Sequence, residues 1–163
     1  VLEASHILFL HQPHHRNFNN RLCNTNNLYF CDTGLVAWLL GIQNEGQVMT
    51  HSLRGALFET WVVAELIKGR CNRGLRSNIF FWRDSTGNEV DVLAEQGERL
   101  IPIEIKAGRT ITTDYFVALN KWSALAGEVA GPALMVYAGD DFQERKTATV
   151  VPWKGVARLA ETL

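Results

Sequence analysis

The sequence predicts an α/β domain in which helices flank a mixed β-sheet. Residues 89–95 and 100–106 each alternate apolar and polar side chains, which is the period of a half-buried strand. Apolar residues at helical spacing extend from residue 53 to 67, and residues 133–137 form a continuous apolar run typical of a buried strand. Helical and strand segments therefore interleave along a chain of 163 residues, a length that suits one domain.

The composition is that of a globular protein with a substantial core, since 47% of the residues are apolar and 20% are charged. The formal net charge of −1 argues against an overall electrostatic attraction to nucleic acid and confines any such surface to a local patch. The chain has no apolar run of membrane-spanning length and no signal peptide, so we expect a cytoplasmic protein without membrane contact. Its cysteines form no CxxC pair, and we expect them to stay reduced: Cys23, Cys31 and Cys71.

The first part of the chain predicts two short strands and a capped helix. Residues 6–10 and 28–31 are apolar strand candidates that pair across a polar, Asn-rich stretch. Asp32 is a candidate N-cap for a helix over residues 34–40. Residues 1–4 are typical of the end of a helix, so we expect this chain to be a piece of a longer protein.

Four histidines lie near the N-terminus, and histidine is a common metal ligand. Their spacing fits no zinc motif, however, and a mobile polar loop explains them better. They are His6, His11, His14 and His15.

The longest predicted helix carries a candidate site residue. Ser52 is its expected N-cap and Gly69 its expected end, and apolar side chains surround it so widely that most of it must be buried. Glu59 and Glu65 are separated by about 120° of rotation, so they do not point to one place. Glu59 has small or apolar helical neighbours, whereas Glu65 has Lys68 one turn later, as a surface acid often does. A buried acid needs a partner, a proton or a metal, which makes Glu59 the candidate.

The second half of the chain adds further strands and helices. In chain order these are a strand at 79–83, a turn at 84–88, an amphipathic helix at 113–126, strands at 133–137 and 147–152, and a helix at 154–162. The sequence contains no internal repeat and no glycine-rich loop followed by Lys and Ser or Thr. This segment by itself is therefore not expected to bind or hydrolyse ATP.

The two alternating strands form a hairpin if Gly97 and Glu98 make the two-residue turn that a Gly-X sequence favours. The resulting register places Asp91 directly opposite Glu104 on one face. On the other face the isoleucines of the second strand point into a core: Ile101, Ile103 and Ile105.

Two carboxylates that face each other across a strand pair destabilise the sheet. A hard cation such as Mg²⁺ removes that repulsion, which predicts a metal at Asp91 and Glu104. Lys106 follows Glu104 on the same face and would stabilise a developing anion or position a water molecule. The alternative, from spacing alone, is a solvated sheet face on which Glu89 and Lys106 form an ordinary ion pair.

A helix acid, a strand Asp and a Glu-x-Lys on the next strand resemble the PD-(D/E)xK, or restriction-endonuclease-like, superfamily. Four residues of this chain match the pattern: Glu59, Asp91, Glu104 and Lys106. Val90 stands where the pattern has Pro, a position that varies in the superfamily. The resemblance implies a restriction-endonuclease-like mixed β-sheet flanked by helices and a catalytic role for all four residues. It also implies Mg²⁺ or Mn²⁺ bound by the three acids and the Ile105 carbonyl, with Lys106 assisting the water that attacks a phosphodiester.

Six blocks of the sequence together resemble a second, narrower group and span nearly the whole chain. They are residues 16–19, 29–35, 55–59, 81–84, 89–91 and 103–106. The group is the C-terminal uncharacterised domain of prokaryotic AAA+ superfamily ATPases. The resemblance implies that residues 1–31 are the tail of a linking winged-helix-like segment and 32–163 the nuclease-like domain, with an N-terminal ATPase module in the full-length chain. The loop before Tyr29 is often Lys-rich in that group but has no Lys here, so no basic DNA-binding surface is expected there.

These patterns leave two functions open. The complete set of four residues favours a nuclease that hydrolyses phosphodiester bonds of DNA or RNA with Mg²⁺ or Mn²⁺. The near-neutral net charge favours a non-catalytic module that binds DNA or a protein and regulates the attached ATPase.

Overall fold

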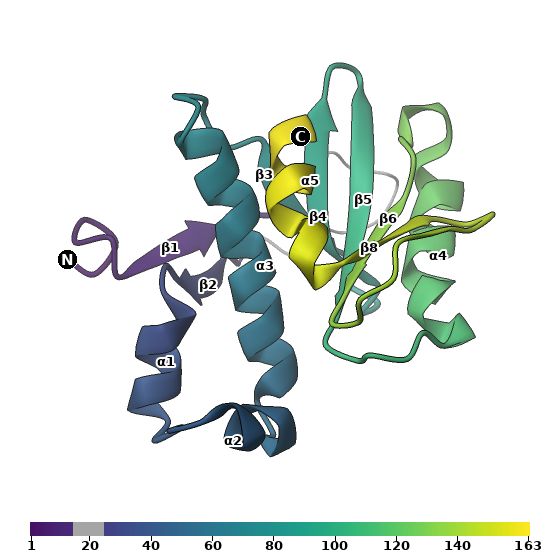
Figure 1. The fold of residues 1–163 in the computed structure, drawn as a ribbon. Helices are drawn as coiled ribbons and strands as arrows, with labels where there is room; N and C mark the ends of the chain where they lie inside the picture. Colours follow the sequence, from purple (N-terminus) through teal and green to yellow (C-terminus); the bar gives the residue numbers. More distant parts are fainter. Residues whose placement is uncertain (15–24) are drawn as a thin grey trace.

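A computed structural model describes residues 1–14 and 25–163, which form a large sheet covered by helices and a small two-stranded sheet (Figure 1). The large sheet has six strands in the order β3-β4-β5-β6-β8-β7. Their bounds are β3 (Ile79–Arg83), β4 (Glu89–Gln96), β5 (Arg99–Lys106), β6 (Leu134–Tyr137), β7 (Gln143–Glu144) and β8 (Thr149–Pro152). The first three strands form an antiparallel meander, whereas β6 is parallel to β5 and β8. The predicted α/β fold with a mixed sheet is confirmed; the two-residue β7 was not predicted.

Helices cover both faces of the large sheet. Their bounds are α3 (Arg54–Cys71), α4 (Val117–Ala126) and α5 (Val156–Thr162), with a 3₁₀ turn at Thr113–Phe116 before α4. Helices α3 and α5 lie side by side on one face in Figure 1, and Ile101, Ile103 and Ile105 pack beneath them as predicted. Helix α4 lies on the other face, where Trp122 packs against Leu93.

The central hairpin has the predicted turn and register. Gly97 adopts a φ of 63°, a conformation that glycine reaches without strain. Pairing between β4 and β5 then runs from Gln96–Arg99 to Val92–Ile103. Because the side chains of a strand alternate, this register decides which face of the sheet each of them reaches.

A bulge in β4 interrupts that alternation close to the predicted site. Val90 packs in the cluster beneath α4, whereas Val92 packs beneath α3, although an unbroken strand would place them on one face. In the described strands the pairing with β5 runs from the turn as far as Val92 and does not include Asp91, the next residue away from the turn. The expected direct opposition of Asp91 and Glu104 is therefore corrected: Asp91 lies at the bulge, beyond the end of the ladder.

The bounds expected for α3 are wrong at both ends. The helix begins at Arg54, and no side-chain cap is seen at its start in the described structure, so Ser52 is not the cap. It also continues through Gly69 to Cys71, because Gly69 serves helix packing instead of ending the helix. A Cβ at Gly69 would lie 2.5 Å from the Cβ of Ala160 in α5, so only glycine permits this close approach.

The small sheet precedes α3 in the chain and lies against the edge of the large sheet. It pairs β1 (Leu8–His11) with β2 (Asn27–Phe30) in antiparallel register, as predicted. A bridge between Pro13 and Phe81 joins this segment to β3, and the His14 N–H donates to the Phe81 carbonyl at 2.7 Å. Residues 12–14, which follow β1, thus pair with the edge of β3 at Phe81.

Two short helices connect the small sheet to α3. Helix α1 (Thr33–Leu39) begins as predicted, because the Asp32 carboxylate accepts the Gly34 N–H at 2.7 Å. Helix α2 (Glu45–Thr50) was not predicted, although Asn44 is a strong N-cap residue and accepts the Gln47 N–H at 3.1 Å.

The expectation of a mobile polar loop is wrong for two of the histidines. His11 is 1% exposed and His14 is 7% exposed. His11 is the last residue of β1 and packs against the rings of Tyr29 and Phe81, so strand pairing and aromatic contacts bury it. The polar sequence around it concealed this position.

The remaining sequence expectations concern residues outside the described ranges, the N-terminus and membrane-spanning helices. His15, Cys23 and the block 16–19 lie outside the described residues. Residues 2–6 form hydrogen-bonded turns instead of the expected end of a helix. Among the helices of residues 1–14 and 25–163, none has the length and apolar character needed to cross a membrane.

The contact between α3 and α5 makes a prediction about glycine replacement. Gly69→Ala should lower the free energy of unfolding by roughly 1–3 kcal/mol, because the clash with Ala160 outweighs the better helix propensity of alanine. Gly55→Ala in the same helix is the matched control, since a Cβ there meets nothing within 4 Å. It should leave stability unchanged or raise it by up to about 1 kcal/mol. Urea unfolding measures both, and equal effects would contradict the packing role of Gly69.

Candidate functional site

The four residues of the predicted site gather at the open end of the β4–β5 hairpin, away from the Gly97 turn. Glu59 comes from α3, Asp91 from the bulge of β4, and Glu104 and Lys106 from the end of β5. Each of the four interacts electrostatically with the others. We call these four residues the acidic cluster.

The choice between the two acids of α3 is confirmed. Glu59 faces Asp91 and Glu104, whereas Glu65 forms an ion pair with Lys68 at 3.0 Å. Rotation along the helix was therefore a reliable guide, whereas the burial expected from the neighbours of Glu59 is only partial, because Gly55 and Ala56 are exposed.

Glu104 has one bonded and one unbonded oxygen. Its Oε1 pairs with Lys106 Nζ at 2.5 Å, while its Oε2 is buried and has no hydrogen-bond partner within the described residues. The residue is 6% exposed, and burial raises the pKa of its carboxyl although Lys106 acts in the opposite direction. A buried carboxylate oxygen without a partner is costly, and it is the kind of atom that a cation would satisfy.

Asp91 is connected to β5 through the backbone. Its Oδ2 accepts the Ile105 N–H at 2.7 Å, just beyond the end of the strand pairing. Burial and the nearby carboxylates of Glu104 and Glu59 raise its pKa well above the ordinary value, against the influence of Lys106 and the Ile105 bond. Glu104 and Glu59 are thus close enough to oppose the ionisation of Asp91.

Lys106 supplies the positive charge of the cluster. Burial alone would lower its pKa, but Glu104 and Asp91 raise it, so the side chain is a cation at neutral pH. The alternative ion pair between Lys106 and Glu89 is replaced by a different one, in which Arg83 contacts Glu89 at 2.5 Å. The solvated-face interpretation fails for Glu104, because that side chain is buried.

Sequence reasoning assigned no role to Tyr29, which also reaches the cluster. Its hydroxyl donates to Glu59 Oε1 at 2.5 Å, and the residue is 7% exposed. Burial and the neighbouring carboxylate of Glu59 raise the pKa of Tyr29, so its hydroxyl keeps its proton. The only sequence feature that could have indicated this role is that a hydroxyl-bearing residue, Tyr29, lies within an otherwise apolar strand.

His11 lies behind the cluster as a buried neutral group. Neither ring nitrogen has a hydrogen bond of ordinary geometry within the described residues. Burial lowers its pKa to about 4, although backbone groups of Asp91 and Phe80 act to raise it.

The donor atoms of the cluster suit a hard cation. Mg²⁺ often binds through one or two carboxylates and keeps several waters, and Asp91 together with Glu104 offers such a pair with one unbonded buried oxygen. Within residues 1–14 and 25–163, however, no three His, Cys, Asp or Glu side chains come together as a metal cluster. The geometry therefore suits a two-carboxylate site better than the expected three-acid set, in which Glu59 is a direct ligand. The Ile105 peptide borders the site through its N–H, while the role expected for its carbonyl stays a prediction.

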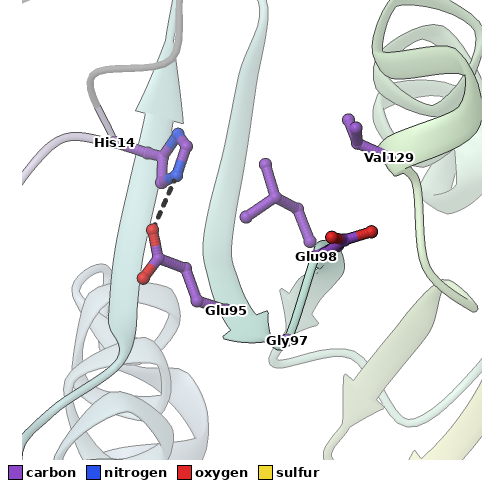
Figure 2. A pocket seen from close by; sticks show the side chains of 6 residues that line it. His14, Glu95, Gly97, Glu98 and Val129 are labelled. Carbon is purple, nitrogen blue, oxygen red and sulfur yellow. Dashed lines mark hydrogen bonds and ion pairs between the residues drawn. The ribbon is translucent and has the colours of Figure 1, made fainter.

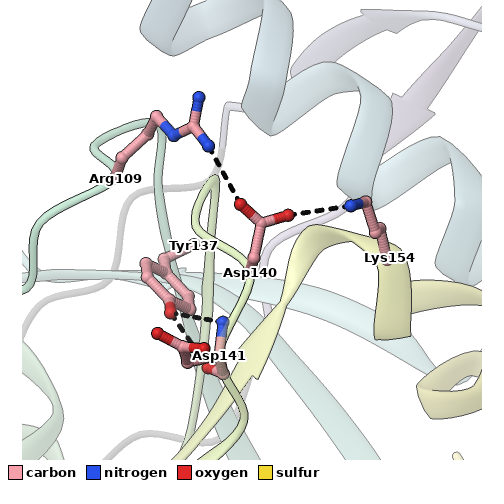
Figure 3. A network of polar contacts seen from close by, with 5 residues as sticks. All are labelled: Arg109, Tyr137, Asp140, Asp141 and Lys154. Atoms are coloured by element: carbon pink, nitrogen blue, oxygen red, sulfur yellow. Dashed lines mark hydrogen bonds and ion pairs between the residues drawn. The ribbon is translucent and has the colours of Figure 1, made fainter.

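Positive side chains lie beyond the carboxyl ends of the parallel strands. Asp140, which follows β6, holds Arg109 and Lys154 at 2.9 Å each, as Figure 3 shows. Arg54 of α3 donates to the carbonyl of Ala107, the residue after Lys106. We call Arg54, Arg109 and Lys154 the cationic edge, which the sequence did not reveal because its members are far apart in the chain.

A cavity of about 610 Å³ lies elsewhere on the molecule (Figure 2). Its lining includes Gly97 and Glu98 of the hairpin turn, and also His14, which pairs with Glu95 at 3.1 Å. The turn is the opposite end of the hairpin from Asp91, so this cavity is separate from the acidic cluster.

The comparisons with known proteins identify a family without a known activity. The family described as "Domain of unknown function (DUF4143)" matches residues 54–156. The matched segment contains all four residues of the acidic cluster, whereas Tyr29 precedes it. No curated protein matches the sequence significantly.

The burial of His11 makes a prediction about pH. Because the folded pKa is about 4 and the ordinary value is 6.5, the folded protein resists protonation of this ring. The stability that depends on neutral His11 is complete above pH 6.5 and is lost as the pH falls toward 4, by about 3 kcal/mol in total. His11→Phe should remove this contribution to the pH dependence, which urea unfolding between pH 4 and 7 measures. An unchanged pH dependence in the variant would show that His11 is not held neutral.

Proposed function

The chain belongs to the DUF4143 family of domains of unknown function, and we propose that its acidic cluster hydrolyses phosphodiester bonds of nucleic acid with Mg²⁺ or Mn²⁺. One observation carries the proposal: the buried, unpartnered Oε2 of Glu104 stands within a group of three carboxylates and one lysine. The resemblance of these four residues to the PD-(D/E)xK pattern supports it. The proposal includes an ATPase module elsewhere in the full-length protein, as in the AAA+ proteins that the chain resembles.

In this proposal Asp91 and Glu104 hold the metal, and Glu59 approaches it directly or through a water molecule. A bound Mg²⁺ or Mn²⁺ would lower the pKa of a water molecule and offset negative charge on the phosphate. Lys106 stays protonated beside Glu104 and stabilises the charge that develops on the phosphate. The Ile105 N–H holds the Asp91 carboxylate in place through its hydrogen bond.

The cationic edge supports nucleic acid as the substrate. Phosphate contacts come mostly from Arg and Lys side chains, and they determine where the strand lies. The edge is next to the cluster along the chain, because Ala107 follows Lys106 and accepts a hydrogen bond from Arg54. The positive charges of the cationic edge outnumber the single negative charge of Asp140 that pairs with Arg109 and Lys154, although the whole chain has a net charge of −1.

A second function, a non-catalytic binding module that regulates the ATPase, is favoured by two observations. In the described part of the chain no three potential ligands gather as a metal cluster, and Lys106 already neutralises one oxygen of Glu104. Such a module would bind DNA or protein through the same surface without cleaving it.

Metal-dependent cleavage separates the two functions. The purified chain should cleave single- or double-stranded DNA or RNA only with Mg²⁺ or Mn²⁺. Lys106→Ala should keep most of the metal affinity and slow cleavage by on the order of 100–1,000-fold, because it removes one stabilising charge. Asp91→Ala should abolish metal binding and cleavage together.

Glu65→Ala is the matched control for these variants, since Glu65 belongs to α3 but pairs with Lys68 on the surface. It should cleave like the wild type. Calorimetric Mn²⁺ titration and gel assays measure the two properties. Metal binding without cleavage of any of these substrates would favour the binding module, whereas cleavage that survives Asp91→Ala would remove the acidic cluster from the reaction.

Nucleic-acid binding by the cationic edge makes a separate prediction. Arg109→Glu combined with Lys154→Glu should weaken binding and reduce the slope of log Kd against log salt by about 2, because two phosphate contacts are lost. Arg145→Glu combined with Lys146→Glu makes the same charge change near the other end of β8, and it should have a much smaller effect. Fluorescence anisotropy with a labelled oligonucleotide measures both, and equal losses would show that binding is not confined to this edge.

A further inference from the structure

We propose that Tyr29 is a positioning residue that holds Glu59 toward Asp91 and Glu104. The small β1–β2 sheet, which carries Tyr29, then contributes to the geometry of the acidic cluster. The inference rests on the proposed function for its consequence on metal binding. It also extends the site beyond the segment matched by the family, because Tyr29 precedes residue 54.

The hydrogen bond between Tyr29 and Glu59 is partly shielded from solvent. The hydroxyl donates to Glu59 Oε1 at 2.5 Å, and only 7% of Tyr29 is exposed. A hydrogen bond to a carboxylate is stronger than one between neutral groups, and partial exclusion of water strengthens it further. The bond is therefore suited to fixing the direction of a flexible glutamate.

Glu59 needs such a restraint because its neighbours repel it. Asp91 and Glu104 both interact unfavourably with its negative charge, and the Glu59 side chain is only half-buried. Free rotation about its side-chain bonds would let the carboxylate turn toward solvent and away from the other two acids. The Tyr29 hydroxyl opposes that rotation.

Aromatic packing holds the Tyr29 ring itself in place. Phe9, its partner in the register of β1 and β2, stacks on it with ring centroids 5.7 Å apart. His11 meets it edge-on at 5.7 Å and contacts Phe81 of β3 at 5.6 Å. This series of rings connects the small sheet to the large one, so the hydroxyl is presented to Glu59 from a rigid support.

The test uses Tyr29→Phe, which keeps the ring and removes the hydroxyl. In the intact chain the Mn²⁺ dissociation constant should rise about 10-fold, because Glu59, which approaches the metal directly or through a water molecule in the proposed function, loses the partner that orients it. Tyr137→Phe is the matched control, because it removes a buried hydroxyl that bonds only the backbone of Asp141 among the described residues. It should leave Mn²⁺ affinity unchanged. Equal affinities in the wild type and Tyr29→Phe would overturn the proposal.

A second measurement without metal keeps the inference separate from the proposed function. Asp91→Asn removes one of the charges that repel Glu59, so it should raise the urea midpoint of the metal-free protein. It should raise the midpoint less in the Tyr29→Phe background, where Glu59 has turned away. Equal increases in both backgrounds would overturn the positioning role. A wild-type protein that binds no Mn²⁺ but shows this coupling would refute the proposed metal site while supporting the role of Tyr29.

Discussion

The antiparallel pairing of β4 with β5 is the interaction on which the rest of the structure depends. Leu93 and Ile103 in these strands are completely buried, and helices pack on both faces of the pair. The Gly97 turn sets the register, and a shift by one residue would exchange the two faces of a strand. The observed register directs the isoleucines of β5 toward α3, and it brings the acids of both strands to the open end of the hairpin.

The end of that pairing creates the local chemistry. Where β4 bulges, the Ile105 N–H donates to the side chain of Asp91 at 2.7 Å. The same break brings a carboxylate close to Glu104, and burial of both raises their pKa values. Clustered buried carboxylates destabilise a fold unless a cation or proton compensates, and Lys106 compensates only in part. Such departures from the most stable arrangement are typical of functional sites.

Helix α3 brings a third acid to this point because its two ends are anchored differently. Gly69 permits close contact with Ala160 near the C-terminal end, and Arg54 bonds to the backbone after β5 at the N-terminal end. Between these anchors Glu59 faces the cluster and meets Tyr29. The site therefore draws on three parts of the chain: the small sheet, the long helix and the central hairpin.

Local sequence patterns were sufficient to predict the central hairpin and the helix acid of the site. Strand alternation and a Gly-X turn determined the hairpin and its register, and helical rotation separated Glu59 from Glu65, because both effects depend only on neighbouring residues. The resemblance to a known pattern named the four residues of the cluster.

Tertiary structure decided what depends on distant partners. The sequence predicted that Gly69 ends a helix, but Gly69 lies inside α3 because it packs against Ala160. The sequence also predicted that His11 is mobile, but His11 packs against Tyr29 and Phe81. The bulge at Asp91 and the bond from Tyr29 to Glu59 likewise arise from contacts between separate elements. A sequence records which groups are available for such contacts, but packing alone determines which of them meet.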